Sequence, residues 1–555
     1  MSHAADEPVT GTHAGKHAPT TTKRQGLRGH PGLTLLAAAL GVMMVGIDGT
    51  IVAVANPAIQ AHLHASLAGI QWVSNGYLLA LAVTLITIGK IGDRVGHRKV
   101  FITGIIGFAA SSAAIGLSGS IAGSISLIIA FRIAQGVFGA MLQPTALALI
   151  RETFPIEKLN AAIGIWGAVV AASSAAGPIV GGLLVQHLNW ESCFYVNVPV
   201  GIIALVVGLL VIRETPRSAA TSFDIPGIGL LSSFLFLLVW ALIKAPDAGW
   251  GSGQTIGYFA GAVAALVLFI VREAKAKQPL LPLTLFRSKQ LSAGTVLVLT
   301  LMFAMFGAMF FMTFFMENVH GLDPVGAGVR LLPLMGMMVV GAPLSGAVIT
   351  RIGSRIPMTV GMVLAAAALF GLSRMSLTSS LNDTILWFAL LGLGLSPVMV
   401  GATEVIVGNA PLRLAGVASG LQSTAMQVGG TIGTAVLGAI MSAKVSGLLP
   451  AAWTAAHLPA LNAAGLASVK SATTVGVAPV PAGSSPQVAA AITNVTHSAF
   501  VSGMSAAFLV AACVALAGAV VAALFLGRKG GPHSDSEPDG LQSDSQPGPV
   551  ELTTA

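Results

Sequence analysis

Residues 34–60 constrain the fold of this chain most strongly, because they form a long apolar run with one carboxylate, Asp48, inside it. A helix that crosses a bilayer needs about 20 apolar residues, and this run is long enough. A charge near the middle of such a helix costs several kcal/mol unless it is paired, solvated or neutralised. Asp48 is therefore a candidate functional residue. The alternative is that Asp48 faces a water-filled vestibule or braces a neighbouring helix.

The composition predicts a membrane protein. Of the 555 residues, 54% are hydrophobic and only 9% are charged, a balance that soluble proteins of this size do not have. The net charge of +8 comes from short basic clusters between apolar runs, which indicates membrane topology rather than a nucleic-acid-binding face. The two cysteines lie far apart in apolar runs and predict neither a disulfide nor a metal site.

Fourteen apolar runs are long enough to be spanning helices, which predicts an all-α polytopic membrane protein. We expect the spans at 33–60, 70–90, 100–118, 123–150, 161–186, 193–212, 225–243, 255–271, 291–316, 325–349, 357–376, 384–409, 415–443 and 498–527. The first run is too long for a cleavable signal sequence, so we expect it to remain as the first span.

The basic residues predict the orientation of these spans. Of the 28 Lys and Arg, 22 fall in the two tails and every second loop, five fall on the other side, and Arg132 lies inside a span. Cytoplasmic loops are enriched in Lys and Arg. We therefore expect both termini in the cytoplasm and the protein in the cell membrane.

A short charged segment, residues 89–99, follows the second span. Its glycines permit close approach of backbones, and its acid can pair with an arginine across a domain boundary. Such a pair would latch two halves of the protein together on the cytoplasmic side. The alternative is a basic loop that only sets orientation. The expected gate residues are Gly89, Asp93, Arg94, Gly96 and Arg98.

Residues 346–355 repeat the glycine and arginine spacing of this segment, with Thr350 in place of the acid. A repeat of helical bundles is what alternating access between two half-transporters requires. The missing acid predicts a weaker second latch.

Four segments together resemble the major facilitator superfamily, and three of them its drug:proton antiporter branch with fourteen spans. Residues 89–99 look like the superfamily's loop signature, 46–52 like the first-span motif with its acid, and 132–140 like the fourth-span motif with its arginine. Residues 177–182 resemble the antiporter motif of the fifth span, although Ser173 stands where the pattern begins with glycine. The expected antiporter-motif residues are Gly177, Pro178, Gly181 and Gly182.

The resemblance implies a major facilitator fold with two six-helix bundles and two extra central helices. We expect a cytoplasmic tail at 1–32, the first bundle at 33–212, two linker helices and a cytoplasmic linker at 213–290, the second bundle at 291–527 and another tail at 528–555. The two tails are expected to be disordered. Residues 450–497, rich in Ala, Ser and Pro, are expected to be a partly helical external loop.

Residue counting places Asp48 and Arg132 at one depth. Asp48 lies 20 residues from Arg28, and Arg132 lies 19 residues from Arg151, which is roughly 30 Å of helix in each case. We therefore predict that Asp48 carries an exchanged proton and that Arg132 stabilises its charged form. The alternative for Arg132 is that it extends to the outer surface. Glu404 is either a second proton or cation site or a residue of a cytoplasmic vestibule.

Polar and flexible apolar side chains of three spans are candidates for substrate binding. Methionine and phenylalanine recur along span nine and suit a cavity for varied apolar ligands, but they also suit plain helix packing. Polar groups in membrane helices likewise often bond only to one another. The candidates are Gln71, Trp72, Asn75, Tyr77, Met305, Phe306, Met309, Gln422 and Gln427.

These features predict a proton-coupled antiporter that exports lipophilic drug-like or antibiotic molecules. The heavy use of Ala and Gly resembles self-resistance exporters of antibiotic producers and indicates a polycyclic aromatic substrate. Proton-linked uptake, lipid translocation and a membrane sensor are the alternatives. The sequence has no phosphate-binding loop and no metal-binding motif, so we expect no enzyme activity and no cofactor. We expect a monomer whose partners are protons, the bilayer and a small lipophilic substrate.

Overall fold

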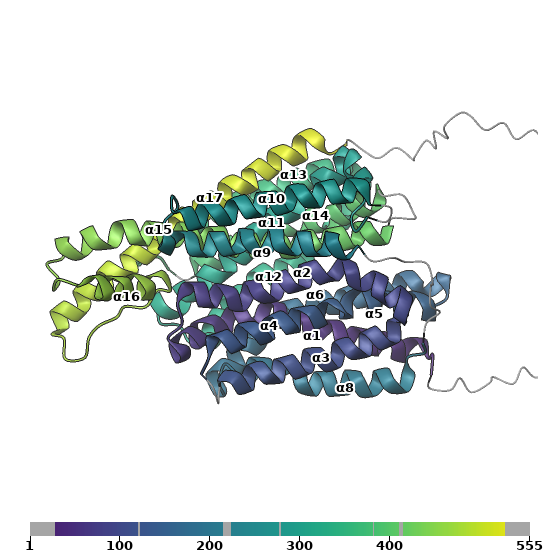
Figure 1. The fold of residues 1–555 in the computed structure, drawn as a ribbon, viewed down its shortest axis with the longest axis horizontal. Coiled ribbons are helices and arrows are strands. Elements are labelled where there is room, and N and C mark those ends of the chain that lie inside the picture. The colour runs from purple at the N-terminus through teal and green to yellow at the C-terminus, as the bar shows by residue number, and fades with distance from the viewer. Residues whose placement is uncertain are drawn as a thin grey trace, which may run out of the picture.

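Long apolar helices that run side by side make up the protein (Figure 1). The structure is a computed structural model, and it describes residues 28–119, 123–214, 224–276, 279–380, 382–409 and 415–527. Within these ranges there is no strand, and fourteen helical segments are long and apolar enough to cross a membrane. The predicted all-α fold with fourteen spans is confirmed.

The helical elements follow one another with short connections. They are α1 (Pro31–Leu63), α2 (Leu67–Val95), α3 (His97–Leu117), α4 (Ile125–Ala140), α5 (Leu142–Thr153), α6 (Ile156–His187), α7 (Ser192–Tyr195), α8 (Asn197–Val211), α9 (Ile225–Ala248), α10 (Gly253–Lys275), η2 (Leu283–Arg287), α11 (Lys289–Phe314), η3 (Phe315–Val319), α12 (Pro324–Ile352), α13 (Arg355–Ser373), α14 (Asp383–Gly408), α15 (Ala415–Ala455), α16 (Ala463–Thr474) and α17 (Pro486–Phe525).

Several helices are longer than the apolar runs that predicted them, whereas the run expected at 123–150 is divided into α4 and α5. Helix α2 continues to Val95 because residues past the apolar run, such as Lys and Arg, are good helix formers. The expected loop at 89–99 is therefore reduced to one turn residue, Gly96, whose φ of +107° favours glycine. Gly353 ends α12 in the same way with a φ of +82°. Residues 89–99 and 346–355, which share a glycine and arginine spacing, thus also share a helix end at a glycine with positive φ.

The helices group into two bundles and a separate pair. Helix α1 packs on α6 and α8, and α2 packs on α4, whereas α12 packs on α14 and α13 packs on α17. Helices α1 to α8 thus form a first bundle and α11 to α17 a second one (Figure 1). Helices α9 and α10 pack on each other, and α9 also contacts α2 of the first bundle and α15 of the second.

The two ends of the molecule differ. We call the end at which α1 begins and α17 ends the terminal end, and the opposite end, which carries α16, the distal end (Figure 1). At the distal end α15 and α17 extend past the other helices and pack with α16 around Trp453, Leu458 and Val469. The indole of Trp453 donates to the Pro459 carbonyl over 2.9 Å. The segment expected to be a partly helical loop therefore contains α16 and the extended ends of α15 and α17, which together form a small folded cap.

Two seams join the bundles toward the distal end. In the first, between α2 and α15, the Gln71 side chain donates to the Thr434 carbonyl over 2.7 Å, and the Thr434 hydroxyl donates to Asn75. In the second, between α6 and α12, a Cβ at Gly182 would lie 2.7 Å from the Pro324 carbonyl oxygen. Small and polar residues thus permit close approach of the bundles, as in other membrane helix pairs.

Candidate functional site

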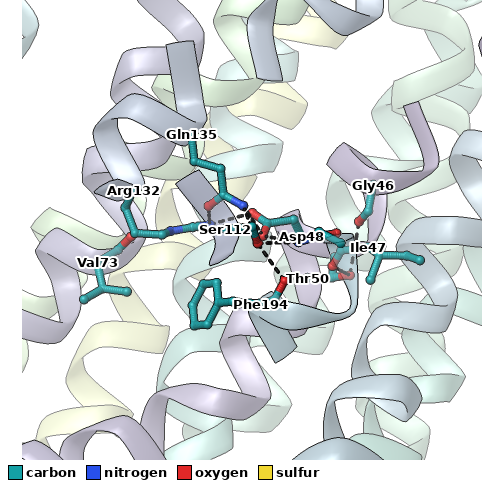
Figure 2. A network of polar contacts seen from close by, with 10 residues as sticks. Gly46, Ile47, Asp48, Thr50, Val73, Ser112, Arg132, Gln135 and Phe194 are labelled. Atoms are coloured by element: carbon teal, nitrogen blue, oxygen red, sulfur yellow. Dashed lines mark hydrogen bonds and ion pairs between the residues drawn. The ribbon is translucent and has the colours of Figure 1, made fainter. Parts of the chain in front are cut away.

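Asp48 lies at the centre of a buried polar network within the first bundle (Figure 2). The guanidinium of Arg132, from α4, donates through Nη1 to Asp48 Oδ2 over 2.5 Å. The Gln135 amide, one turn further along α4, donates to Asp48 Oδ1 over 2.9 Å and accepts from Arg132 Nη1 over 2.7 Å. The three side chains are between 0% and 2% exposed. They therefore form a closed triangle with almost no contact with solvent or lipid.

Two further helices complete the network. Asn197, the first residue of α8, donates to Asp48 Oδ1 over 3.2 Å and to the Ser112 hydroxyl of α3 over 3.0 Å. Ser112 in turn donates to the Phe194 carbonyl over 2.7 Å. Arg132, Gln135 and Asn197 all donate to the carboxylate, and an ionised carboxylate only accepts. The network thus joins α1, α3, α4 and α8 through one acid.

The rest of Arg132 is also held by the first bundle. Its Nε donates to the Val73 carbonyl of α2 over 3.0 Å, and its guanidinium carbon lies 4.1 Å from the centre of the Tyr77 ring. A cation over an aromatic face is stabilised, most strongly where water is excluded. Arg132 is only 2% exposed, so it does not extend to the outer surface. Asp48 and Arg132 lie at one level and in contact, as the residue count predicts.

Arg132 also lines a small cavity between the two bundles. The first bundle contributes Tyr77 and Asn56 to its wall, and the second contributes Phe306, Met309 and Phe310 of α11 and Thr434 of α15. The cavity volume is about 30 Å³. One water needs about 10–15 Å³ and drug-sized ligands need about 300 Å³ or more. In this conformation the cavity therefore has room for water but not for a drug.

The structure separates the predicted substrate-binding residues into groups. Tyr77, Phe306 and Met309 line the cavity, whereas Gln71 and Asn75 belong to the seam between α2 and α15. Met305 is buried in the hydrophobic core. Gln422 donates to the Thr403 hydroxyl of α14, and Gln427 is half-buried on α15. None of these last three residues lines the cavity.

Trp72 lies on the opposite face of α2 from the cavity. Its ring centre is 5.7 Å from that of Phe236 and 5.6 Å from that of Trp240, both on α9. Tyr258 of α10 extends this group, which we call the α9 aromatic cluster. Trp72 does not line the central cavity, because helical periodicity turns residue 72 away from Tyr77. Its expected role in orienting substrate stays a prediction.

The predicted gate residues lie at the terminal end of α2 and α3. Arg98 donates to the Leu209 carbonyl of α8 over 3.2 Å. Gly96 lies against Glu214, whose carboxylate occupies the space that a Cβ would need. These contacts stay within the first bundle. Arg94 is exposed at the end of α2. The side-chain positions of Gly89 and Asp93, and with them the predicted latch, lie outside the described residues.

The antiporter-motif residues form two contact surfaces on α6. A Cβ at Gly177 would collide with the Thr50 hydroxyl of α1, which donates to the Ser174 carbonyl over 2.9 Å. Gly181 also faces α1, whereas Gly182 and Pro178 face the start of α12 in the second bundle. The motif therefore brings α6 close to the helix that carries Asp48 and, on its other side, to the second bundle.

Glu404 lies apart from the Asp48 network. It is on α14 of the second bundle, near the terminal end, and its side chain is exposed. This position fits the vestibule interpretation as well as that of a second proton or cation site, and both stay predictions.

Sequence reasoning did not single out Gln135, Asn197, Ser112 and Asn56. Two of them carried a usable signal. Gln135 lies three residues after Arg132 and therefore on the same helix face, and Asn197 is an amide in a nearly continuous apolar run. Buried polar groups in membranes need partners, so both amides could have been paired with Asp48 or Arg132.

Two bundles of membrane-spanning helices, with a cavity between them and a buried acid–arginine pair in the first, define the chain as a membrane-embedded transporter. Residues 38–434 match the Major Facilitator Superfamily, and the chain belongs to this family. It is 56% identical over 515 residues to the "Tetracenomycin C resistance and export protein" of Streptomyces glaucescens, covering 92% of this chain and 95% of that one. It is 35% identical over 418 residues to the "Multidrug resistance protein Stp" of Mycobacterium tuberculosis, covering 75% and 77%. The predicted family, with its resistance and export proteins, is confirmed.

Solved structures support the same fold. A bacterial homologue of the human lysosomal transporter Spinster, in an inward-facing and occupied conformation, aligns with a TM-score of 0.60 over 89% of this chain and 96% of that one. The D-xylose-proton symporter aligns with a TM-score of 0.56 over 90% and 98%. The identities are 18% and 11%, so these two comparisons concern the fold alone.

Proposed function

We propose that this protein is a proton-coupled antiporter that exports lipophilic drug-like or antibiotic molecules from the cytoplasm by alternating access. The observation that carries the proposal is the buried Asp48–Arg132 pair, whose arginine also lines the cavity between the bundles. The names of the relatives, which include antibiotic and multidrug resistance proteins, support export as the direction. We further propose that the terminal end faces the cytoplasm, in line with the 22 basic residues that the sequence assigns to the tails and to every second loop.

The shared arginine offers a physical route to coupling. Arg132 donates to Asp48 on one side and faces the cavity on the other. A proton on Asp48 removes the anion that compensates the guanidinium, and an apolar substrate in the cavity would then exclude water from an uncompensated charge, which is costly. Each binding event thus weakens the other. Such negative coupling between two ligands is reciprocal, and it is what an antiporter needs.

Substrate binding requires the bundles to move. The cavity of about 30 Å³ is too small for a drug-sized molecule, so a transport cycle must enlarge it. The two seams, Gln71 with Thr434 and Gly182 with Pro324, are contacts that must break when the distal end opens. Besides these bonds, opening must separate the packed surfaces of α2 and α15 and of α6 and α12.

The cavity wall fits a lipophilic substrate. Phe306, Met309 and Phe310 present aromatic rings and a flexible thioether on the second-bundle side. Such side chains repack around varied flat apolar ligands. We propose polycyclic aromatic antibiotics as the substrate class. Tetracenomycin C, after which the 56% identical relative is named, is the first compound to test.

Transport in energised vesicles tests the proposal. Inverted membrane vesicles with an imposed inward-acidic pH step should accumulate tetracenomycin C when they contain the wild-type protein. The Asp48→Asn variant should not, whereas Lys444→Gln, on the exposed face of α15, should match the wild type. Full accumulation by Asp48→Asn would overturn the coupling mechanism. Substrate loss from preloaded inverted vesicles, with no accumulation, would favour proton-linked uptake instead.

A further inference from the structure

A second, larger cavity lies at the distal end, away from the Asp48 network. It is enclosed by α2, α9, α15 and α16, so both bundles, the cap and the extra helix pair contribute to it. Its volume is about 370 Å³, which lies within the range of about 300–1,000 Å³ that small-molecule sites occupy. This cavity can hold a drug-sized molecule in the conformation in which the central cavity cannot.

One charged side chain lines this distal cavity. It is Lys470 of α16, which is half-buried. No ion pair joins its ammonium group to any carboxylate in the part of the chain that the structure describes. An ammonium group offers three hydrogen-bond donors and no acceptor. The cavity thus presents an uncompensated positive charge to whatever enters it.

Hydroxyl groups surround this charge. Ser442 and Ser446 lie four residues apart on α15 and therefore on one face of that helix. Ser471 adds a hydroxyl from α16, whereas the hydroxyl of Thr474, which also lines the cavity, donates to the Ser471 carbonyl over 2.7 Å. Hydroxyls rotate to donate to an anion, and hydrogen bonds to charged groups are stronger than those between neutral groups. The polar side of the cavity therefore fits an acidic group.

The remaining wall is apolar. Leu67 of α2 and Ile243 and Pro246 of α9 face the same space. A site with one cation, several hydroxyls and an apolar wall matches an amphiphilic organic anion. The acid would bind at Lys470, and the hydrocarbon or aromatic body would lie against α2 and α9.

Gln71 links the distal cavity to the path between the bundles. Its side chain lines the cavity and also donates to the Thr434 carbonyl in the seam between α2 and α15. Thr434 in turn lines the central cavity. The seam between α2 and α15 therefore lies between the central cavity and the distal cavity.

We infer that the distal cavity is an exit site that binds the acidic group, a carboxylate or phenolate, of an exported aromatic molecule through Lys470. The identity of the ligand as an exported molecule rests on the proposed function. The binding itself does not, because it needs no proton gradient and no transport. A negative result in vesicles combined with intact binding would therefore overturn the proposed function and leave this site in place.

Binding of a fluorescent aromatic acid tests the inference. The probe is 9-anthracenecarboxylate, with its uncharged methyl ester as the matched ligand, titrated into the full-length protein in phosphatidylcholine nanodiscs. The wild type should bind the acid about tenfold more tightly than the ester, the size expected for one hydrogen-bonded charge. Lys470→Gln should abolish this preference. Lys444→Gln, which removes an exposed lysine of α15 outside the cavity, should retain it.

Two further measurements complete the test. Ala467→Phe narrows the cavity without changing its charge, so it should weaken binding of both acid and ester. Equal affinity of wild type and Lys470→Gln for the acid would overturn the inference.

Nanodiscs that contain phosphatidylglycerol distinguish an exported acid from a lipid headgroup as the source of the anion. Loss of acid binding there in the wild type would assign the site to a lipid headgroup and overturn its assignment to an exported molecule.

Discussion

Neutralising both members of the Asp48–Arg132 pair should destabilise the protein no more than neutralising one of them. Asp48→Asn leaves the Arg132 guanidinium buried, at 2% exposure, without its anion. Removing one partner of a buried ion pair costs about 3–5 kcal/mol, because the other charge stays uncompensated. Arg132 keeps the Val73 carbonyl and the Tyr77 ring as partners, so we expect a loss of about 3 kcal/mol, at the lower end of that range.

Arg132→Gln should behave in the same way for the opposite charge. Asp48 would keep the amides of Gln135 and Asn197 as donors, and we again expect a loss of about 3 kcal/mol. The double variant Asp48→Asn/Arg132→Gln contains no buried charge at the pair. Its loss should therefore be smaller than the sum of the single losses by on the order of 3 kcal/mol, the upper range for directly interacting residues.

Reversible unfolding in sodium dodecyl sulfate, followed by circular dichroism for the four proteins of this cycle, measures these free energies. Glu404→Gln is the control, because it neutralises an exposed carboxylate and should change stability by less than about 0.5 kcal/mol. The double variant should be as stable as either single variant, and it should lack proton-driven export. Additive losses across the cycle would refute the reasoning, since they would mean that the two side chains do not interact energetically.

The remaining predictions concern helix contacts and rings. Gly182→Ala should lose about 1–3 kcal/mol in the same unfolding assay, because its Cβ would lie 2.7 Å from the Pro324 carbonyl oxygen; an unchanged stability would contradict the close contact. Gly96→Ala should lose about 1–3 kcal/mol because of the φ of +107°, and a stabilised variant would contradict this. Trp72→Ala should lose about 3 kcal/mol from the α9 aromatic cluster, yet retain export per folded molecule in vesicles. Tyr77→Phe should unfold like the wild type, whereas Tyr77→Ala should be less stable, because only the ring lies under Arg132.

The sequence predicts the spans and the depth of the central pair well, for simple physical reasons. A bilayer sets the length of each apolar run, and a helix rises by a constant distance per residue. Counting from basic residues at the predicted cytoplasmic edge therefore placed Asp48 and Arg132 at one level, where the structure has them in contact. That contact confirms the predicted common level of the two side chains. The proton-carrying role of Asp48 stays a prediction.

Helix rotation and helix length were harder to predict. Trp72 and Tyr77 belong to one span, but one faces α9 and the other the cavity. Which face of α2 meets which neighbour depends on the packing of helices distant in sequence. The folded cap was also missed, because α15 continues to Ala455 through residues that are only moderately apolar. Its small hydrophobic core around Trp453 forms from segments that are too short to be recognised alone.

The position of α9 has a mechanical consequence for the proposed cycle. Because α9 touches α2 in one bundle and α15 in the other, any rotation that separates Gln71 from Thr434 must slide both surfaces along the same helix. The α9–α10 hairpin would then stay in contact with both bundles as they move. It would keep lipid acyl chains out of the gap that opens between α2 and α15. Excising the hairpin would give a twelve-helix protein in which Trp72 loses its contacts with α9. Such a protein would need other apolar side chains over Trp72 to keep lipid out of the gap between the bundles during transport.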